Sequence, residues 1–80
     1  MNKIEVRLFA NLRKYHPDAG DGDAFALELD DRVKLGGLVD ELKIPRQEIG
    51  LLRVNGRWQK ENYPINDGDR IELFALIGGG

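Results

Sequence analysis

The sequence predicts an α+β domain in which one main helix packs on one face of a mixed sheet of four to five strands. Three observations lead to this prediction. Several short runs alternate apolar and polar residues, a single run has helical periodicity, and their order along the chain is strand, strand, helix, strand, strand, strand. One helix over one sheet face buries all these apolar positions at once. We assign residues 1–75 to a single domain and residues 76–80 to a flexible C-terminal tail.

The first predicted strand covers residues 3–9, where Ile4, Val6 and Leu8 fall on one face. Phe9 interrupts the otherwise polar second face. Residues 11–15 favour a short helical turn ended by His16 and Pro17, because proline disfavours helix at the residue before it. Residues 24–30 alternate again, which indicates a hairpin with the first strand.

The segment between these strands holds three aspartates within six residues, at 18, 21 and 23. Their spacing does not match a calcium-binding EF-hand loop, and no glutamate stands at its closing position. We therefore interpret this segment as a solvated loop.

The helix is predicted from the i, i+3, i+4, i+7 spacing of Leu35, Leu38, Val39 and Leu42. Gly36 and Gly37 lie near its start and could offer backbone amides to a phosphate. No glycine-rich fingerprint follows a strand here, so we favour close packing as their role. Pro45 ends the helix.

The C-terminal half contains three further predicted strands, at residues 51–54, 57–59 and 70–77, with a turn at 47–50. Asn55-Gly56 supplies the residues that a type I′ hairpin turn requires. Trp58 is predicted to be a half-buried packing residue, and residues 62–69 have turn composition.

The predicted core consists of apolar residues on the inward faces of these elements, and the first and last strands are expected to lie side by side. Its fourteen members are Ile4, Val6, Leu8, Phe25, Leu27, Leu29, Leu35, Leu38, Val39, Leu42, Leu52, Val54, Ile71 and Leu73.

The composition excludes several classes of functional site and of partner. The chain has no cysteine, which excludes disulfides, thiolate metal sites and a cysteine nucleophile. A formal net charge of −2 gives no electrostatic footprint for nucleic acid. No apolar run approaches the length of a membrane span, and no signal peptide is evident, so we expect no membrane partner and a cytoplasmic location.

The last strand runs directly into Gly78-Gly79-Gly80. Glycine has no Cβ, so such a tail fits channels too narrow for other residues and leaves the last carbonyl carbon unhindered. We expect this tail to present a terminal carboxylate to partner enzymes, although disordered chain ends are also commonly rich in glycine.

The chain resembles ubiquitin-like β-grasp proteins, and more narrowly the sulfur carriers of the molybdopterin-synthase small-subunit and thiamine-pathway type. The resemblance spans nearly the whole chain. Its short pieces are Val6-Arg7-Leu8-Phe9-Ala10 with Leu12-Arg13, the helix 38–42, Val54-Asn55-Gly56, and residues 64–71 leading into Ile77-Gly78-Gly79-Gly80. The opening Leu8-Phe9-Ala10 is closer to the molybdopterin branch. Two departures are Gly78, where another small residue is usual, and residues 31–34, which lack a threonine-like helix cap.

The resemblance implies a carrier rather than an enzyme. A partner activating enzyme would use ATP to adenylate the carboxylate of Gly80, and a sulfur donor would convert it to a thiocarboxylate. The sulfur would then pass to a cofactor precursor on a second partner, a synthase large subunit or another acceptor. The chain itself would bind no cofactor or metal and supply no catalytic residue. Its single histidine, His16, is interpreted as a surface residue.

A docking surface follows from the strand order. If the first and last strands are neighbours, Arg7 should lie near Glu72 and Phe9 near Phe74, on the face away from the helix. Two phenylalanines on an exposed face form an interaction patch rather than scattered apolar surface. We expect Arg7, Phe9, Phe74, Leu76 and Ile77 to bind partners.

Three alternatives remain. The chain could be a ubiquitin-like protein modifier joined to lysines through Gly80, or a sulfur carrier of the thiamine pathway. It could also be a β-grasp binding module without a working tail. For such a module, the absence of cysteine excludes an iron–sulfur type and the charge disfavours a nucleic-acid type.

Overall fold

The computed structural model describes residues 1–17 and 24–76. The described elements follow the predicted order, with two short 3-10 helices added at connections. They are β1 (Asn2–Leu8), η1 (Ala10–Tyr15), β2 (Phe25–Leu29), α1 (Leu35–Glu41), η2 (Arg46–Glu48), β3 (Ile49–Val54), β4 (Arg57–Gln59) and β5 (Arg70–Ala75). The predicted turns at 11–15 and 47–50 correspond to η1 and η2.

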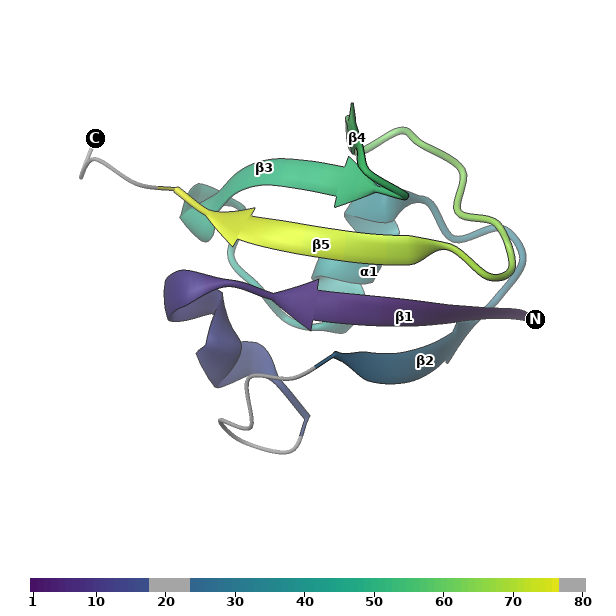
Figure 1. Cartoon of the computed structure of the whole chain (residues 1–80), viewed down its shortest axis with the longest axis horizontal. Coiled ribbons are helices and arrows are strands. Elements are labelled where there is room, and N and C mark those ends of the chain that lie inside the picture. Colours follow the sequence, from purple (N-terminus) through teal and green to yellow (C-terminus); the bar gives the residue numbers. More distant parts are fainter. Residues whose placement is uncertain (18–23, 77–80) are drawn as a thin grey trace.

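The five strands form one mixed sheet in the order β2-β1-β5-β3-β4. β1 and β5 run parallel at its centre, whereas all other neighbours are antiparallel. Figure 1 shows α1 behind the sheet, with η1 and η2 at the end where β1 and β5 finish. The predicted fold class is therefore confirmed, and so is the pairing of the first and last strands.

The core lies between α1 and the inward face of the sheet. Eleven of the fourteen predicted core residues are buried, and the other three, Phe25, Leu27 and Leu42, pack against the core while partly exposed. The structure adds three residues that the pattern missed: Leu12, Ile44 and Ile65. Each stands in a connection or a single turn, where no repeat of two or 3.6 residues marks the inward side.

The start of α1 is capped by backbone rather than by a side chain. Its N-cap, Lys34, makes no side-chain capping bond. Instead, the amides of Leu35 and Gly36 donate to the carbonyls of Tyr63 and Glu61, both at 2.9 Å. A Cβ on Gly36 would lie 2.8 Å from Glu61 Oε1. The packing role predicted for this glycine is confirmed, because a larger residue would separate α1 from the 61–63 segment.

The β3–β4 turn has the predicted conformation, with φ values of 51° at Asn55 and 83° at Gly56. The Asn55 side chain also reaches the start of β5. Its Oδ1 accepts from the amide of Arg70 at 2.9 Å, and its Nδ2 donates to Asp69 Oδ1 at 2.9 Å. One residue thus closes the hairpin and fixes the neighbouring strand.

Asp69 is buried and forms a polar centre at the entry to β5. Besides Asn55, it accepts from the hydroxyl of Tyr63 at 3.2 Å and from the amide of Asn66 at 2.9 Å. A further hydrogen bond joins this turn to β1, because the amide of Gly68 donates to Lys3 O at 2.8 Å. Composition predicted only a turn here, whereas the structure shows the anchor that sets the register of β5 beside β1.

The ends of four strands differ slightly from the prediction, with β1 and β2 each differing by one residue at both ends. β3 starts two residues earlier than predicted, at Ile49, and β5 ends at Ala75 rather than at Ile77. Ile77 and the glycines that follow lie outside the described residues, as do the aspartates at 18, 21 and 23.

Candidate functional site

The candidate site begins where the predicted tail leaves the sheet. Leu76 is the last described residue, and its side chain is 54% exposed. Its amide donates to the carbonyl of Glu48 at 2.9 Å. The backbone at the root of the tail is therefore bound to the segment that joins η2 to β3. The predicted carrier residues Gly78, Gly79 and Gly80 lie outside the described residues.

Gly50 lets the strands approach closely at this root. The β3–β5 register shifts between Ile49, which pairs with Ala75, and Leu51, which pairs with Phe74. A Cβ on Gly50 would lie 2.8 Å from the carbonyl oxygen of Ala75, a backbone atom that cannot turn aside. The irregularity thus requires glycine, and it fixes where the chain leaves β5.

Glu48 is itself held in place from both sides. Its Oε2 accepts from the hydroxyl of Tyr15 at 2.7 Å, and its Oε1 lies 3.3 Å from Lys14 Nζ. The Tyr15 hydrogen bond, followed by Lys14, lowers the pKa of the Glu48 carboxyl. The same hydrogen bond raises the pKa of the Tyr15 phenol. These contacts join η1 to η2 beside the root of the tail.

Phe9 and Phe74 lie together on the open face of the sheet, as predicted. Their rings stack with centroids 4.6 Å apart and planes 7° apart. The amide of Phe9 continues the ladder by donating to Leu73 O at 3.1 Å. Ala10 then takes a left-handed φ of 55°, which turns the chain into η1 directly after the ring. The predicted neighbours Arg7 and Glu72 are also opposite each other in the β1–β5 register.

Two further residues extend this contact across the sheet. Trp58 packs edge-on to Phe74 with centroids 5.7 Å apart, and the Arg53 guanidinium lies 5.0 Å from the Phe74 ring and 5.3 Å from the Trp58 ring. The aromatic–arginine stack, defined as Phe9, Phe74, Arg53 and Trp58, therefore extends from the end of β1 across β5, β3 and β4.

Sequence reasoning missed two members of the stack. Trp58 was expected to be half-buried, but 57% of it is exposed, because β4 is a three-residue edge strand with no element covering its open face. The alternation of side chains along each strand could have revealed both residues. Since Arg53 and Trp58 are paired in the hairpin, their side chains had to share the open face. Leu51, also exposed, adds apolar surface beside Phe74.

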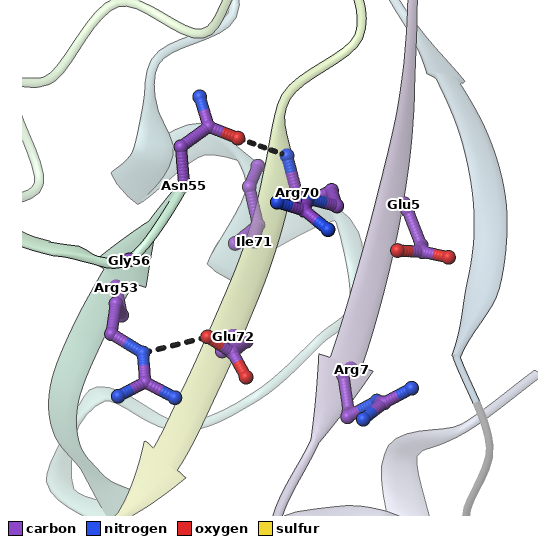
Figure 2. A pocket seen from close by; sticks show the side chains of 8 residues that line it. All are labelled: Glu5, Arg7, Arg53, Asn55, Gly56, Arg70, Ile71 and Glu72. Carbon is purple, nitrogen blue, oxygen red and sulfur yellow. Dashed lines mark hydrogen bonds and ion pairs between the residues drawn. The ribbon is translucent and has the colours of Figure 1, made fainter.

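An ion pair holds the middle of the stack. Arg53 Nε donates to Glu72 Oε1 at 2.6 Å, as Figure 2 shows. This bond lowers the pKa of Glu72, and the charges of Arg53, Arg7 and Arg70 add to the effect. It also raises the pKa of Arg53. The guanidinium is thereby oriented before any partner arrives.

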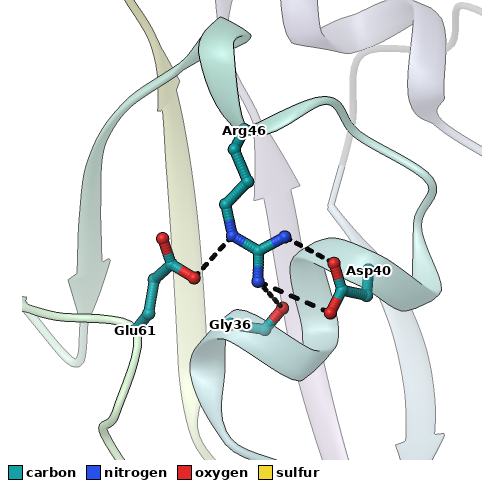
Figure 3. Close-up of polar contacts among 4 residues, drawn as sticks. All are labelled: Gly36, Asp40, Arg46 and Glu61. Atoms are coloured by element: carbon teal, nitrogen blue, oxygen red, sulfur yellow. Dashed lines mark hydrogen bonds and ion pairs between the residues drawn. The ribbon is translucent and has the colours of Figure 1, made fainter.

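A second polar cluster lies on the opposite side of the molecule and serves the fold. Arg46 bonds to the carboxylates of Asp40 and Glu61 and to the carbonyl of Gly36 (Figure 3). The bond from Arg46 lowers the pKa of Asp40. Because Arg46 of η2 bonds to Asp40 and Gly36 of α1 and to Glu61, we assign this cluster to holding α1 against η2 and the 61–63 segment.

The surface position expected for His16 is wrong. The residue is only 6% exposed, and its ring meets Phe25 edge-on with centroids 4.6 Å apart. It caps the C-terminal end of η1, where its amide donates to Arg13 O at 3.0 Å. The proline that follows gave the end of the turn but no indication of which way the imidazole points.

Over residues 1–17 and 24–76, no three His, Asp or Glu side chains gather closely enough to hold a metal ion. Within the same ranges, no helix has the length and apolar character needed to cross a bilayer.

The sequence matches a family model described as Mut7-C ubiquitin over residues 1–76. The chain belongs to the Mut7-C ubiquitin family. This match covers the whole sheet, the helix and the root of the tail, and it ends before the residues predicted to act as a carrier. No curated protein sequence matches the chain.

Solved structures show how widely the fold of this Mut7-C ubiquitin chain is shared. A Pyrococcus furiosus protein designated molybdopterin converting factor subunit 1 superposes with a TM-score of 0.75 at 21% identity, over 96% of this chain and 100% of that one. Small archaeal modifier protein 1 of Haloferax volcanii gives 0.74 at 17% identity, over 96% and 100%. A Helicobacter pylori complex of molybdopterin-converting factor subunits 1 and 2 gives 0.61 at 21% identity, over 98% and 99%.

At these identities the likeness establishes the fold. The resemblance to ubiquitin-like β-grasp proteins, inferred from short sequence pieces, is confirmed by the family match and by the folds of these structures.

Proposed function

We propose that this Mut7-C ubiquitin chain is a sulfur carrier whose Gly80 carboxylate is activated and loaded by partner enzymes. The observation that carries the proposal is the placement of the tail root. Leu76 leaves the sheet beside the partly exposed stack of Phe9 and Phe74, so one partner surface can bind the body and receive the tail. The three glycines that follow would enter a narrow active site without steric hindrance.

The partner enzymes would load Gly80 in two steps. A carboxylate oxygen of Gly80 attacks the α-phosphorus of ATP, and the bond to pyrophosphate breaks. Hydrosulfide then attacks the acyl carbon, a C–S bond forms, and the C–O bond to AMP breaks. The product is a thiocarboxylate on Gly80, which gives up its sulfur on a second partner. The chain acts as a substrate and non-catalytic subunit and binds no cofactor of its own; ATP belongs to the activating enzyme.

We further propose molybdopterin synthesis as the destination, with a synthase large subunit as the sulfur-accepting partner. Two solved structures with this fold support it, because one is designated subunit 1 of a molybdopterin converting factor and the other is subunit 1 bound to subunit 2. A cytoplasmic location belongs to the same proposal, since the reaction draws on soluble ATP and soluble partner enzymes.

The docking role of the open face is also part of this proposal. Arg7, Phe9, Phe74 and Leu76 would contact the partner, with Ile77 following the root of the tail. Aromatic and arginine side chains contribute most to binding when their positions are fixed beforehand. Stacking fixes Phe9 and Phe74, and the exposed side of both rings faces away from the core.

The test is to incubate the chain with an ATP-dependent activating enzyme from the same organism, ATP and sulfide, and to weigh the intact protein. We expect one oxygen to be replaced by one sulfur at Gly80, with no product when ATP is omitted or when Gly79-Gly80 is deleted. The intact mass of the protein isolated from its own organism checks that Gly80 is its C-terminal residue in the cell. An unchanged mass with active partner enzyme would contradict the proposal.

Protein modification is the second candidate, favoured by the similarity of the fold to small archaeal modifier protein 1. Both outcomes use the same activated Gly80 and differ in the nucleophile that attacks it. A lysine-linked Gly80 remnant in peptides from cells would support modification, whereas a thiocarboxylate on the isolated chain would support sulfur transfer.

A further inference from the structure

A shallow pocket of about 290 Å³ lies on the open face of the sheet, next to the aromatic–arginine stack. Three arginines and two glutamates supply its charged lining: Arg7, Arg53, Arg70, Glu5 and Glu72. They come from β1, β3 and β5, the three central strands, which are held in register by the sheet itself. The charged side chains therefore stand on paired strands, and the Asn55-Gly56 turn also lines the pocket.

Some charged side chains in this pocket form an ion pair and others do not. Arg53 and Glu72 are paired with each other at 2.6 Å. Arg7 and Arg70 are exposed, and neither forms an ion pair within the part of the chain that the structure describes. Figure 2 shows their guanidinium groups without a partner contact, with the Glu5 carboxylate as the remaining anion. The pocket thus carries excess positive charge on a chain whose formal net charge is −2.

We infer that this arginine pocket binds the carboxylates of an acidic segment of a protein partner. Arginine is suited to this role because its planar, always charged guanidinium accepts a carboxylate in a bidentate geometry. A segment with two carboxylates would engage Arg7 and Arg70, the two cations that the pocket leaves available. Under the proposed function, on which this identification of the partner rests, the segment belongs to the activating enzyme or the sulfur acceptor.

The position of the pocket ties it to the docking surface. Arg7 on β1 precedes Phe9 by two residues, Phe9 lying just past the end of the strand, and Glu72 precedes Phe74 by two on β5. Residues two apart on a strand lie about 7 Å apart on the same face. A partner that covers the phenylalanine pair therefore needs an acidic group only about 7 Å farther along the strands, away from the tail.

A protein ligand fits this pocket better than nucleic acid. Glu5 and Glu72 alternate with the arginines, so the regularly spaced phosphates of a nucleic-acid backbone would meet repulsion at every second position, whereas the long side chains of a glutamate peptide can turn away from the two glutamates. Nucleic-acid surfaces also carry clustered basic residues on a basic domain, whereas this chain is acidic overall. Separate carboxylates on a folded partner can be spaced to avoid the two glutamates.

The first experiment uses hexaglutamate as the probe and the whole isotope-labelled chain in a two-dimensional NMR titration at low salt. We expect shifts at the amides of residues 5–7 and 70–72, and weaker binding as salt is added. The R7Q/R70Q double variant should bind about tenfold more weakly. The R13Q/R32Q double variant is the control, because it removes the same charge from exposed positions outside the pocket and should bind as wild type does.

Three outcomes would overturn the inference: shifts that fall outside the pocket, an equal loss of binding in both double variants, or tighter binding of oligothymidylate at the same amides. The second outcome would leave only net charge acting, and the third would assign the pocket to nucleic acid.

A second experiment uses the loading reaction of Gly80. R7Q/R70Q should raise the KM for the carrier about tenfold while kcat stays within about twofold, because the lost contacts serve binding rather than chemistry. R13Q/R32Q should change neither value. Normal loading of R7Q/R70Q by an enzyme that loads wild type overturns the pocket alone. If wild type is never loaded, the proposed function is wrong. The hexaglutamate titration then tests independently whether the arginine pocket binds carboxylates.

Discussion

The two faces of β5 differ in what their side chains contact, although they alternate along one six-residue strand. Ile71 and Leu73 point inward and are completely covered by the core. Glu72 and Phe74 point outward, where they meet Arg53 and Phe9 and stay partly exposed. The inward residues have only apolar neighbours, whereas each outward residue is positioned by a specific partner on an adjacent strand.

This contrast separates stability from recognition within one strand. The inward face obtains its free energy from excluded water, which is insensitive to the exact neighbour. The outward face gains little from burial, and its order comes from stacking, cation–π contact and an ion pair. Substitutions on the two faces should therefore have effects of different kinds, which the following predictions test.

The largest effect should come from Leu73→Ala. Removing a fully buried side chain from the centre of the core should cost about 2–5 kcal/mol in the free energy of unfolding. Urea unfolding followed by circular dichroism measures the loss. Where the variant remains folded, its partner binding should equal that of wild type, because Leu73 has no exposed surface.

The matched variant is Phe74→Ser on the outward face. It should cost clearly less stability than Leu73→Ala and weaken partner binding by about tenfold or more, since it removes the centre of the aromatic–arginine stack. If Phe74→Ser instead unfolds the chain as strongly as Leu73→Ala and leaves binding unchanged, the division between the two faces is wrong.

The inward face was also the more predictable one. Alternation and helical spacing gave the strands, the helix, the side-by-side placement of β1 and β5 and most of the core. The buried residues that the sequence pattern did not predict all lie outside its regular repeats. Leu12, Ile44 and Ile65 are buried from irregular segments, and Asp69 is buried because Asn55, Tyr63 and Asn66 satisfy it. Periodicity carries no information where the backbone does not repeat.

On the outward face, the sequence predicted pairs of neighbours but not the complete stack. Phe9 with Phe74 followed from strand order alone and is confirmed. Trp58 and Arg53 depended on the edge strand β4 remaining uncovered, which is a property of the assembled sheet. The need for Gly50 was hidden for the same reason, because it arises from a register shift against β5, a strand far along the chain.

A smaller effect is expected from Gly50→Ala, which extends the comparison to the end of β5. The new methyl would lie 2.8 Å from Ala75 O, so β3 and β5 must separate there, at a cost of about 1–3 kcal/mol. The amide of Leu76 should lose its bond to Glu48 O, which hydrogen exchange detects as faster exchange at residue 76.

The control is Gly37→Ala, where the added Cβ would lie 3.0 Å from a methyl of the Val33 side chain, which can shift, and where the helix gains propensity. Its free energy of unfolding should stay within about 1 kcal/mol of that of wild type. If Gly50→Ala is as stable as wild type and the Leu76 amide remains protected, then the close approach at Gly50 does not hold the root of the tail.

The smallest effect concerns the pH dependence of the Arg53–Glu72 pair. Because Arg53 lowers the pKa of Glu72 in the folded chain, the pair stabilises the fold above the ordinary glutamate pKa of about 4.3 and loses that contribution as pH falls through the lowered pKa. Solvent reaches both side chains, so the contribution should stay below about 1 kcal/mol at neutral pH.

Urea unfolding from neutral to acidic pH should therefore show wild type more stable than Glu72→Gln at neutrality, with the difference in the free energy of unfolding vanishing at the acidic end. Arg53→Gln and the double variant complete the cycle, and the coupling between the two substitutions should vanish over the same pH interval. A coupling that persists unchanged in acid would show that the contact acts through packing and not through the charge of Glu72.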